Sequence, residues 1–231
     1  VGLGDRAGPS NRALILRTCR ADGVIVRPDV PVAALDRCYQ GHAALEPNPL
    51  VGEAHTRHEA GRWIYLVSLH AWRGEEALRF RLPLADLGPL APAAPVVAWD
   101  WRRGRAQRLE PESGFDLELA PLDWDYRVLC PVLPGELAVI GDRDRYATAG
   151  DRRLAAVRAT PAGLAFGVLG APGERGRIAG GAAGGPAGAT RWEAGRGRAP
   201  LALDWDANGT LWSPVVEVGA SGWCGIEVAA G

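Results

Sequence analysis

Residues 123–142 read D-W-D-Y-R-V-L-C-P-V-L-P-G-E-L-A-V-I-G-D, and this stretch decides the fold that the sequence predicts. In its first half, one face of an extended chain carries Trp124, Tyr126, Val128 and Cys130, and the other face carries Asp125, Arg127 and Leu129. This period of two predicts a half-buried strand. Residues 137–140 are apolar on both faces, which predicts a strand in the middle of a sheet covered on both sides. With Pro134-Gly135 as a tight turn, the two strands are expected to form a hairpin.

The expected hairpin holds no residues equipped for catalysis. Its ionisable groups are Asp123, Asp125, Arg127, Glu136 and Asp142, and they include neither a histidine nor the spacing of metal ligands. The function therefore has to be sought elsewhere in the chain or in a partner domain.

Length and composition indicate one main domain without a charged binding surface. A chain of 231 residues can bury a substantial core, and all-β sandwiches of this size are commonly single domains. It contains no methionine and begins at Val1, so we expect a fragment or a cut-out domain. The 26 basic residues are all arginine, which, with 31 glycines and 18 prolines, indicates the codon bias of a GC-rich genome. A net charge of −1 predicts neither nucleic acid nor an anionic membrane as a partner.

The cysteines and the hydropathy pattern exclude several other classes. Cys19, Cys38, Cys130 and Cys224 are scattered and form no C-x-x-C pair, so they are interpreted as small buried hydrophobic residues and not as zinc ligands. No cofactor is expected. No apolar run approaches the roughly 20 residues that cross a bilayer, and no signal-peptide pattern appears. A cytoplasmic location is favoured.

The first third of the chain is expected to hold little regular structure. Ser10 is placed to cap a short helix that runs to residue 20, although a strand over residues 13–18 also fits the pattern. Residues 24–26 predict a short strand, and prolines then indicate an irregular stretch to about residue 60.

The rest of the chain reads as short strands between Gly, Pro and Asp turns. Besides the central stretch, strands are predicted over residues 62–72, 77–82, 96–101, 115–119, 154–158, 164–169, 175–178, 201–205, 211–218 and 226–228. Residues 180–189 are rich in Gly and Ala and predict a surface loop. Many short strands with hardly any helix predict an all-β fold, an antiparallel β-sandwich with a short N-terminal helix.

Two motifs have the composition of metal sites, and neither predicts one. His55, His58 and Glu59 lie in H-T-R-H-E, where the spacing fits no zinc motif and an exposed loop is the favoured interpretation. The second, D-x-D-x-N-G at residues 204–209, matches half of a calcium loop, but Val215 stands where a bidentate glutamate is required. A hairpin with Asn208-Gly209 in a type I′ turn is favoured there.

Nine tryptophans raise the possibility of sugar stacking. Trp63, Trp72 and Trp124 fall in predicted strands where the core accounts for them. Trp99 and Trp101 share one face of their strand and are the best candidates for an exposed platform that binds a carbohydrate substrate, although packing in a core or between domains is favoured.

The central stretch and several other motifs occur in a recognisable order. L-G-D-R-A-G-P-S-N-R at residues 3–12 precedes D-G-V-I-V-R-P-D-V-P at 22–31 and L-D-R-C-Y at 35–39. After the central D-W-D-Y-R-V-L-C-P-V-L and A-V-I-G-D comes Y-A-T-A-G-D-R-R-L at 146–154. In this order the motifs resemble the C-terminal β-sandwich domain of raffinose synthase and α-galactosidase-like glycoside hydrolases.

The resemblance implies a division of labour within a longer polypeptide. Residues 1–22 would be the trailing end of a (β/α)8 barrel and residues 23–231 a β-sandwich domain. In such enzymes the paired catalytic carboxylates sit on the barrel, so no catalytic residue is carried over to this chain. Asp5 alone occupies a place near the sugar site. The chain is then expected to be a non-catalytic domain of a glycosidase or transglycosidase of the α-galactoside class, with that barrel as its partner and with carbohydrate bound through the barrel. An autonomous carbohydrate-binding module that uses Trp99 and Trp101 is the alternative.

Overall fold

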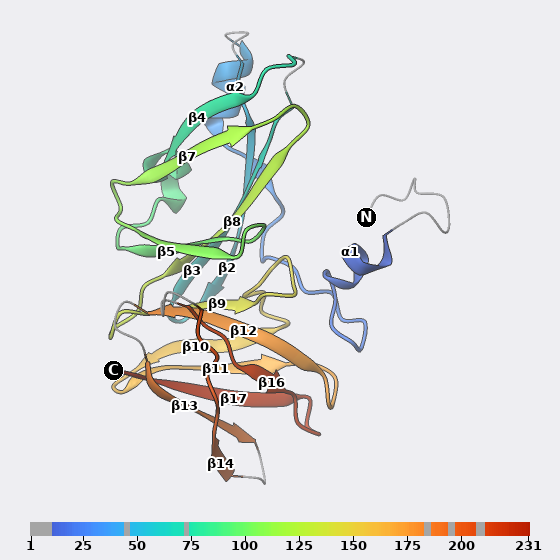
Figure 1. Ribbon diagram of the computed structural model, residues 1–231, viewed down its shortest axis with the longest axis vertical. Coiled ribbons are helices and arrows are strands. Elements are labelled where there is room, and N and C mark those ends of the chain that lie inside the picture. The colour runs from blue at the N-terminus through green and yellow to red at the C-terminus, as the bar shows by residue number, and fades with distance from the viewer. Residues whose placement is uncertain (1–10, 44–46, 72–73, 183–185, 194–196, 207–210) are drawn as a thin grey trace.

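The computed structural model describes residues 11–43, 47–71, 74–182, 186–193, 197–206 and 211–231. Nearly all regular structure in this part of the chain consists of antiparallel strands, arranged in stacked sheets (Figure 1). The expected fold class, an all-β antiparallel sandwich, is confirmed.

A six-stranded sheet lies at the centre of the molecule. Its order is β1-β2-β3-β8-β5-β6, and every neighbouring pair is antiparallel. The bounds are β1 Ala33–Ala34, β2 Leu50–His58, β3 Gly61–Leu69, β5 Val96–Asp100, β6 Arg105–Leu109 and β8 Trp124–Pro131.

Smaller elements cover the upper face of this sheet in the view of Figure 1. They are the antiparallel pair β4 Leu78–Pro83 and β7 Gly114–Leu119, the 3-10 segment η1 Leu84–Leu90 and the helix α2 Asp36–Ala43. Between these elements and the sheet lies the upper core, which includes Ile64, Leu66, Leu82 and Leu129.

Two further sheets lie on the other side (Figure 1). One contains β9 Leu137–Asp142, β12 Arg175–Ala182, β15 Leu211–Trp212 and β16 Val215–Glu217, with β12 as the common partner. The other has the order β10-β11-β17-β13-β14, with bounds Leu154–Thr160, Gly163–Leu169, Trp223–Ala230, Pro186–Glu193 and Gly197–Pro200. The lower core lies among them and includes Trp63, Val128, Ile140 and Ile226.

Alternate residues of the central strands enter different cores. On β3, Trp63 contributes to the lower core and its neighbour Ile64 to the upper core. On β8, Val128 and Leu129 divide in the same way, and all four side chains are almost fully buried. The expected period of two is therefore present in β8, and both of its faces are covered over residues 128–130, whereas Trp124 at the other end of the strand is 37% exposed.

The expected hairpin between β8 and β9 is wrong. β8 is hydrogen-bonded to β3 along one edge and to β5 along the other, so no edge remains for β9. Only a single bridge, Leu133 with Leu137, joins the two segments, and Gly135 and Glu136 take positive φ values of 78° and 57° there. The chain thus crosses to another sheet, where β9 pairs with β12. All six residues of β9 are buried, which confirms a strand covered on both sides. Its expected place in the middle of a sheet is wrong, because among the described strands β9 pairs with β12 alone.

The N-terminal helix is shorter than expected. The helix α1 spans Arg12–Leu16, and the side chain of Asn11 caps it by accepting hydrogen bonds from the backbone N–H of Ala13 (3.0 Å) and Leu14 (3.3 Å). The cap is therefore Asn11, whereas Ser10 lies outside the described residues. A strand over residues 13–18 does not form, and residues 24–26 contribute only one bridge, between Ile25 and Cys19.

Regular structure replaces several expected loops. The stretch before residue 60 contains α2 and β2, and the arginine turn after β5 leads into β6. The Gly/Ala-rich segment is not a loop over residues 180–182, because Gly180 lies in β12 beneath Trp212, where a Cβ atom would come within 2.0 Å of the indole. Residues 186–189 likewise belong to β13. Conversely, residues 201–205 form no strand and contribute one bridge, between Trp205 and Trp212.

The cysteines mostly behave as small hydrophobic residues. Cys38, Cys130 and Cys224 are buried, Cys19 is half-buried, and all four are free thiols. Burial raises the pKa of Cys130, so its thiol stays protonated at neutral pH. As for membranes, no helix among the described residues is long and apolar enough to span a bilayer.

Candidate functional site

Both faces of the central sheet continue beyond the cores into open depressions. On the lower-core face, Trp124 and Tyr126 of β8 and Tyr65 of β3 line a depression of about 500 Å³, called here the aromatic groove. Its opposite wall comes from the N-terminal segment and includes Ile25 and Val32, each 63% exposed. Of the described residues that line the groove, only Arg27 is charged. The groove is therefore an apolar surface without convergent hydrogen-bonding groups.

An aromatic cluster fixes the floor of the groove. The Tyr126 hydroxyl donates a 2.7 Å hydrogen bond to the Tyr146 carbonyl, and burial raises the pKa of Tyr126 well above its ordinary value. Behind it, the Trp101 ring lies 6.1 Å from the Tyr126 ring and 5.2 Å from the Tyr146 ring. Trp101 also donates from Nε1 to the Arg145 carbonyl at 3.2 Å. These contacts hold the groove open without a bound partner.

Hydrogen bonds to an ion pair of the sandwich hold the N-terminal segment in place. Glu174 accepts a hydrogen bond from the Ala21 backbone (3.1 Å) and pairs with Arg145, whose other nitrogen donates to the Leu16 carbonyl (2.9 Å). Burial by itself would raise the pKa of Glu174, but hydrogen bonds from Ala171 and Ala21 and the charge of the fully buried Arg153 keep it below its ordinary value.

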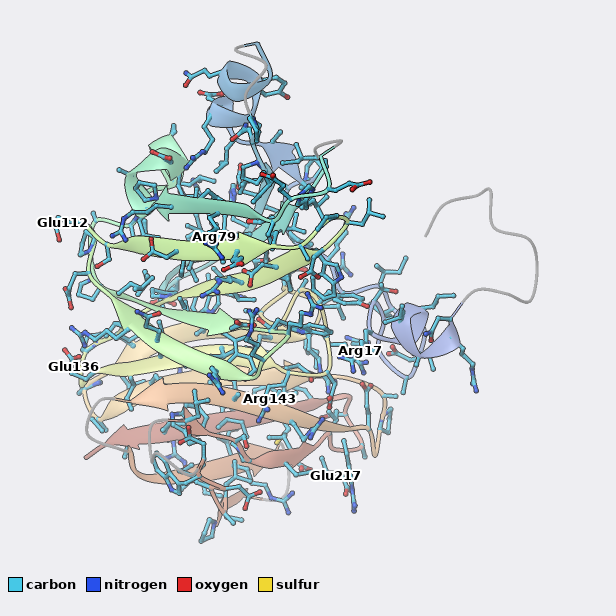
Figure 2. The ribbon with its side chains drawn as sticks, turned by 45° about the horizontal axis from the view of Figure 1, so that its top comes forward. Arg17, Arg79, Glu112, Glu136, Arg143 and Glu217 are labelled. Carbon is cyan, nitrogen blue, oxygen red and sulfur yellow. The ribbon has the colours of Figure 1, made fainter. Side chains whose placement is uncertain are left out.

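The helix α1 lies beyond these anchors and to the side of the stacked sheets (Figure 1). Within the described chain it buries none of its side chains, and Leu14 and Leu16 are 50% and 45% exposed. Arg17, at the base of this segment (Figure 2), places its guanidinium 4.8 Å from the centre of the Trp101 ring. The segment is thus held at its base and leaves an apolar helix unpacked.

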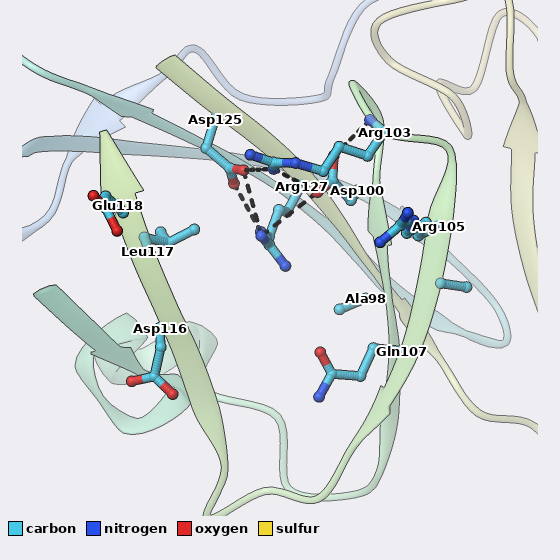
Figure 3. A pocket seen from close by; sticks show the side chains of 11 residues that line it. Ala98, Asp100, Arg103, Arg105, Gln107, Asp116, Leu117, Glu118, Asp125 and Arg127 are labelled. Carbon is cyan, nitrogen blue, oxygen red and sulfur yellow. Dashed lines mark hydrogen bonds and ion pairs between the residues drawn. The ribbon is translucent and has the colours of Figure 1, made fainter. Parts of the chain in front are cut away.

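The upper-core face leads into a depression of a different kind (Figure 3). This polar cleft, of about 370 Å³, lies between β5, β6 and β8 on one side and β7 on the other. Asp100 and Asp125 are buried in it, and they pair with Arg103 (2.9 and 3.2 Å) and with Arg127 (3.6 and 2.7 Å). The Arg127 guanidinium also lies 4.7 Å from the centre of the Phe115 ring.

The Asp100 carboxylate of the cleft stays ionised at neutral pH. Burial would raise the pKa of Asp100, but hydrogen bonds from the Arg103 side chain and backbone and the charge of Arg127 hold it below its ordinary value. A glycosidase of the usual kind needs one carboxyl group with a raised pKa to protonate the leaving oxygen. Arginines pair with both Asp100 and Asp125, and the lowered pKa of Asp100 does not suit a general acid.

The tryptophans expected to form a sugar platform do not present an open face together. Trp99 is only 2% exposed, belongs to the lower core, and has the Arg143 guanidinium 5.1 Å from its ring centre (Figure 2). Trp101 is half-buried under Arg17 and against the two tyrosines. The favoured interpretation, packing in a core, agrees with the structure, because Trp99 belongs to the lower core and Trp101 packs against it. Their role in sugar binding stays a prediction, and so does that of Asp5, which lies outside the described residues.

The histidine motif lies in a strand and not in an exposed loop. His55 and His58 belong to β2, and His58 Nε2 lies 2.8 Å from the Ala149 carbonyl, while its ring packs edge-on against Trp63 at 5.0 Å. In the described part of the chain, no three His, Cys, Asp or Glu side chains come together as a metal site.

The calcium-like motif is consistent with the expected hairpin as far as it is described. The Asp206 backbone N–H donates to the Leu211 carbonyl (2.9 Å), the Ser213 N–H donates to the Asp204 carbonyl (2.8 Å), and the Asp206 carboxylate accepts from the Leu211 N–H (3.0 Å). Asn208 and Gly209 lie outside the described residues.

The polar cleft was not predicted from the sequence. Its signal was present, because Asp125 and Arg127, like Arg105 and Gln107, stand two residues apart in their strands and therefore share a face. What the sequence could not show is that these pairs belong to neighbouring strands.

Comparison with known proteins gives partial likenesses to solved structures. No family model matches the chain, and neither does any curated protein. A crystal structure of a candidate α-N-acetylgalactosaminidase from Bacillus halodurans aligns with 45% of this chain at 17% identity and a TM-score of 0.34. The aligned part spans 21% of that protein. The chain thus has a weak structural similarity, over part of its length, to a glycoside hydrolase.

Proposed function

We propose that this chain is the non-catalytic C-terminal β-sandwich of a glycosidase or transglycosidase acting on α-galactosides, and that it docks on the catalytic barrel through the aromatic groove and α1. Residues 1–22 then belong structurally to the barrel and residues 23–231 to the sandwich. The enzyme class is supported by the order of the motifs that carry the resemblance. The central motifs of this order occupy β8, β9 and the turn into β10.

The observation that carries the docking role is the unpacked apolar surface at the N-terminal end. Ile25 and Val32 expose aliphatic side chains on the wall of a groove that has an aromatic floor, and Leu14 and Leu16 expose two more on α1 in the same N-terminal segment. Burial of one such side chain contributes about 1.5–3 kcal/mol. A short helix with no buried side chain gains little from propensity alone, so a partner surface accounts for its sequence.

The first test is the coding sequence upstream of Val1. An upstream (β/α)8 barrel with paired carboxylates at its strand ends is expected, and any other upstream domain overturns the proposal. Residues 1–231 alone are expected to show no turnover of nitrophenyl α-galactosides, because the cleft carboxylates are held by arginines. Turnover that copurifies with this chain contradicts the non-catalytic role.

The second test places a charge in the groove of the full-length enzyme. Ile25→Asp is expected to lower both the melting temperature and the activity, since it buries a carboxylate against the barrel. Val215→Asp is the matched control, because Val215 is 51% exposed and lies on β16, away from the groove. If the two variants behave alike, the groove is not the docking surface.

A further inference from the structure

We propose that the polar cleft binds one acidic monosaccharide of the uronic acid type, with its carboxylate on Arg105. The sugar part of this inference rests on the proposed function, whereas the requirement for a single negative charge follows from the cleft itself.

The strand register builds the cleft in rows. Asp100 stands directly opposite Arg105 of β6 and directly opposite Arg127 of β8, so these three residues cross the sheet on one face. In the next row, Ala98 stands opposite Gln107. Figure 3 shows Arg105 and Gln107 on one side of the cleft, facing the ion pairs of Asp100, Asp125 and Arg127. The rows therefore place a cation, an amide and a buried ionic cluster around one space.

The charges in this space do not cancel. Arg103 and Arg127 balance Asp100 and Asp125, whereas Arg105 makes no ion pair within the described residues. On the β7 side, Asp116 pairs with Arg81 and Glu118 pairs with Arg79, so that side is neutral. When Arg79 and Arg81, which lie outside the cleft lining, are counted with their partners, the charge of Arg105 alone remains unbalanced, and it matches one carboxylate. A phosphate monoester would bring nearly two negative charges, which the cleft does not balance.

Hydroxyl groups also find partners in the cleft. A guanidinium has five N–H donors, so Arg127 and Arg103 keep donors beyond those used by the two aspartates. The Gln107 amide is exposed and can both donate and accept. The methyl group of Ala98 and the side chain of Leu117 add an apolar patch. At about 370 Å³ the cleft lies at the small end of the about 300–1,000 Å³ typical of ligand pockets, which suits one sugar ring better than a chain.

The test is a titration of the chain with D-galacturonate, followed by NMR of the backbone amides and arginine Nε–H groups. Saturable shifts are expected at residues 98–107 and 125–127. D-Galactose and acetate are the two reference probes, and each is expected to bind at least about tenfold more weakly than D-galacturonate. Galactose lacks the charge, and acetate lacks the hydroxyl groups. Equal affinity for acetate overturns the sugar inference, and equal affinity for galactose overturns the charge match.

Variants locate the site. Arg105→Gln is expected to weaken galacturonate binding by about tenfold or more, since it removes a charged hydrogen bond while leaving an exposed strand position intact. Arg175→Gln, on a pair with Glu217 on β12 and β16 whose side chains are 73% and 49% exposed and do not line the cleft, is expected to change the affinity by less than about twofold. No saturable shift, or an Arg105→Gln variant that binds normally, refutes the proposal. The titration uses this chain alone, so its failure leaves the docking role untouched, and failure of the groove variants leaves the cleft untouched.

Discussion

The aromatic groove and the polar cleft lie on opposite faces of the central sheet and share the strand β8, yet their chemistry is opposite. Tyr126 belongs to the groove, and Arg127, the next residue of β8, belongs to the cleft. The groove offers apolar surface with one charged residue among its described lining, while the cleft is lined by arginines and carboxylates that form ion pairs. A single strand serves both because successive side chains point to opposite faces. A sheet whose two faces are both covered can therefore present an apolar depression on one face and an ionic depression on the other.

The prediction with the largest expected effect concerns the two faces of the central sheet and asks whether both are needed for stability. Trp63→Ala removes a fully buried indole that donates a hydrogen bond to Val139, and it is expected to cost about 3–5 kcal/mol of unfolding free energy. Leu129→Ala, on the other face, is expected to cost about 2–5 kcal/mol. Urea unfolding measures both. Leu122→Ala is the control, because Leu122 is 91% exposed. An unchanged free energy of unfolding at either position would mean that the core on that face of the sheet does not contribute to stability.

The second prediction concerns the ionic cluster of the cleft. Asp125→Ala leaves Arg127 without its closest partner and is expected to destabilise the fold by about 2–3 kcal/mol, less than for a fully buried pair because Arg103 is half exposed. Asp116→Ala breaks an exposed pair with Arg81 and is expected to cost less than about 0.5 kcal/mol. Equal costs in urea unfolding would contradict the burial of the cluster.

The third prediction is a pH dependence specific to the cleft. The pKa of Asp100 is lowered in the folded state, so its contribution to stability is fully present above its unfolded value of about 3.9 and is lost as the pH falls through the folded value. Asp100→Asn is therefore expected to be destabilising at pH 7, and its difference from the parent chain is expected to shrink toward pH 3. Unfolding midpoints at pH 7, 5 and 3 check this. A difference that stays constant over this range would show that the carboxylate charge is not involved.

The smallest effect belongs to the groove. Tyr126→Phe removes the hydrogen bond to the Tyr146 carbonyl and is expected to cost about 1 kcal/mol, independent of pH between 3 and 7. Tyr39→Phe, at a position that is 66% exposed, is the matched control and is expected to be neutral. Thermal unfolding of both variants at two pH values is sufficient. A strong pH dependence of the Tyr126 variant would remove the distinction between an apolar groove and an ionic cleft.

Local patterns predicted the strands well where a strand has a consistent alternation. The bounds expected for β4, β5, β7 and β11 agree with the structure to within one or two residues. The β2 strand was missed because prolines before it indicate irregular structure, and its hydrogen bonds to β3 supply what its own sequence does not signal. Similarly, the Gly-rich part of β12 has no strand signal, and it is Trp212 that requires glycine there.

The sequence by itself determined the all-β class and which residues of β8 share a face, because both follow from the period of a single strand. Only the tertiary structure decided that β8 and β9 part into different sheets, since that depends on β3 and β5 occupying both edges of β8. It also decided that Trp99 is covered and that Arg105, Asp100 and Arg127 stand in one row. Strand pairing joins residues far apart in the chain, and such contacts depend on how the whole chain packs, which no local pattern specifies.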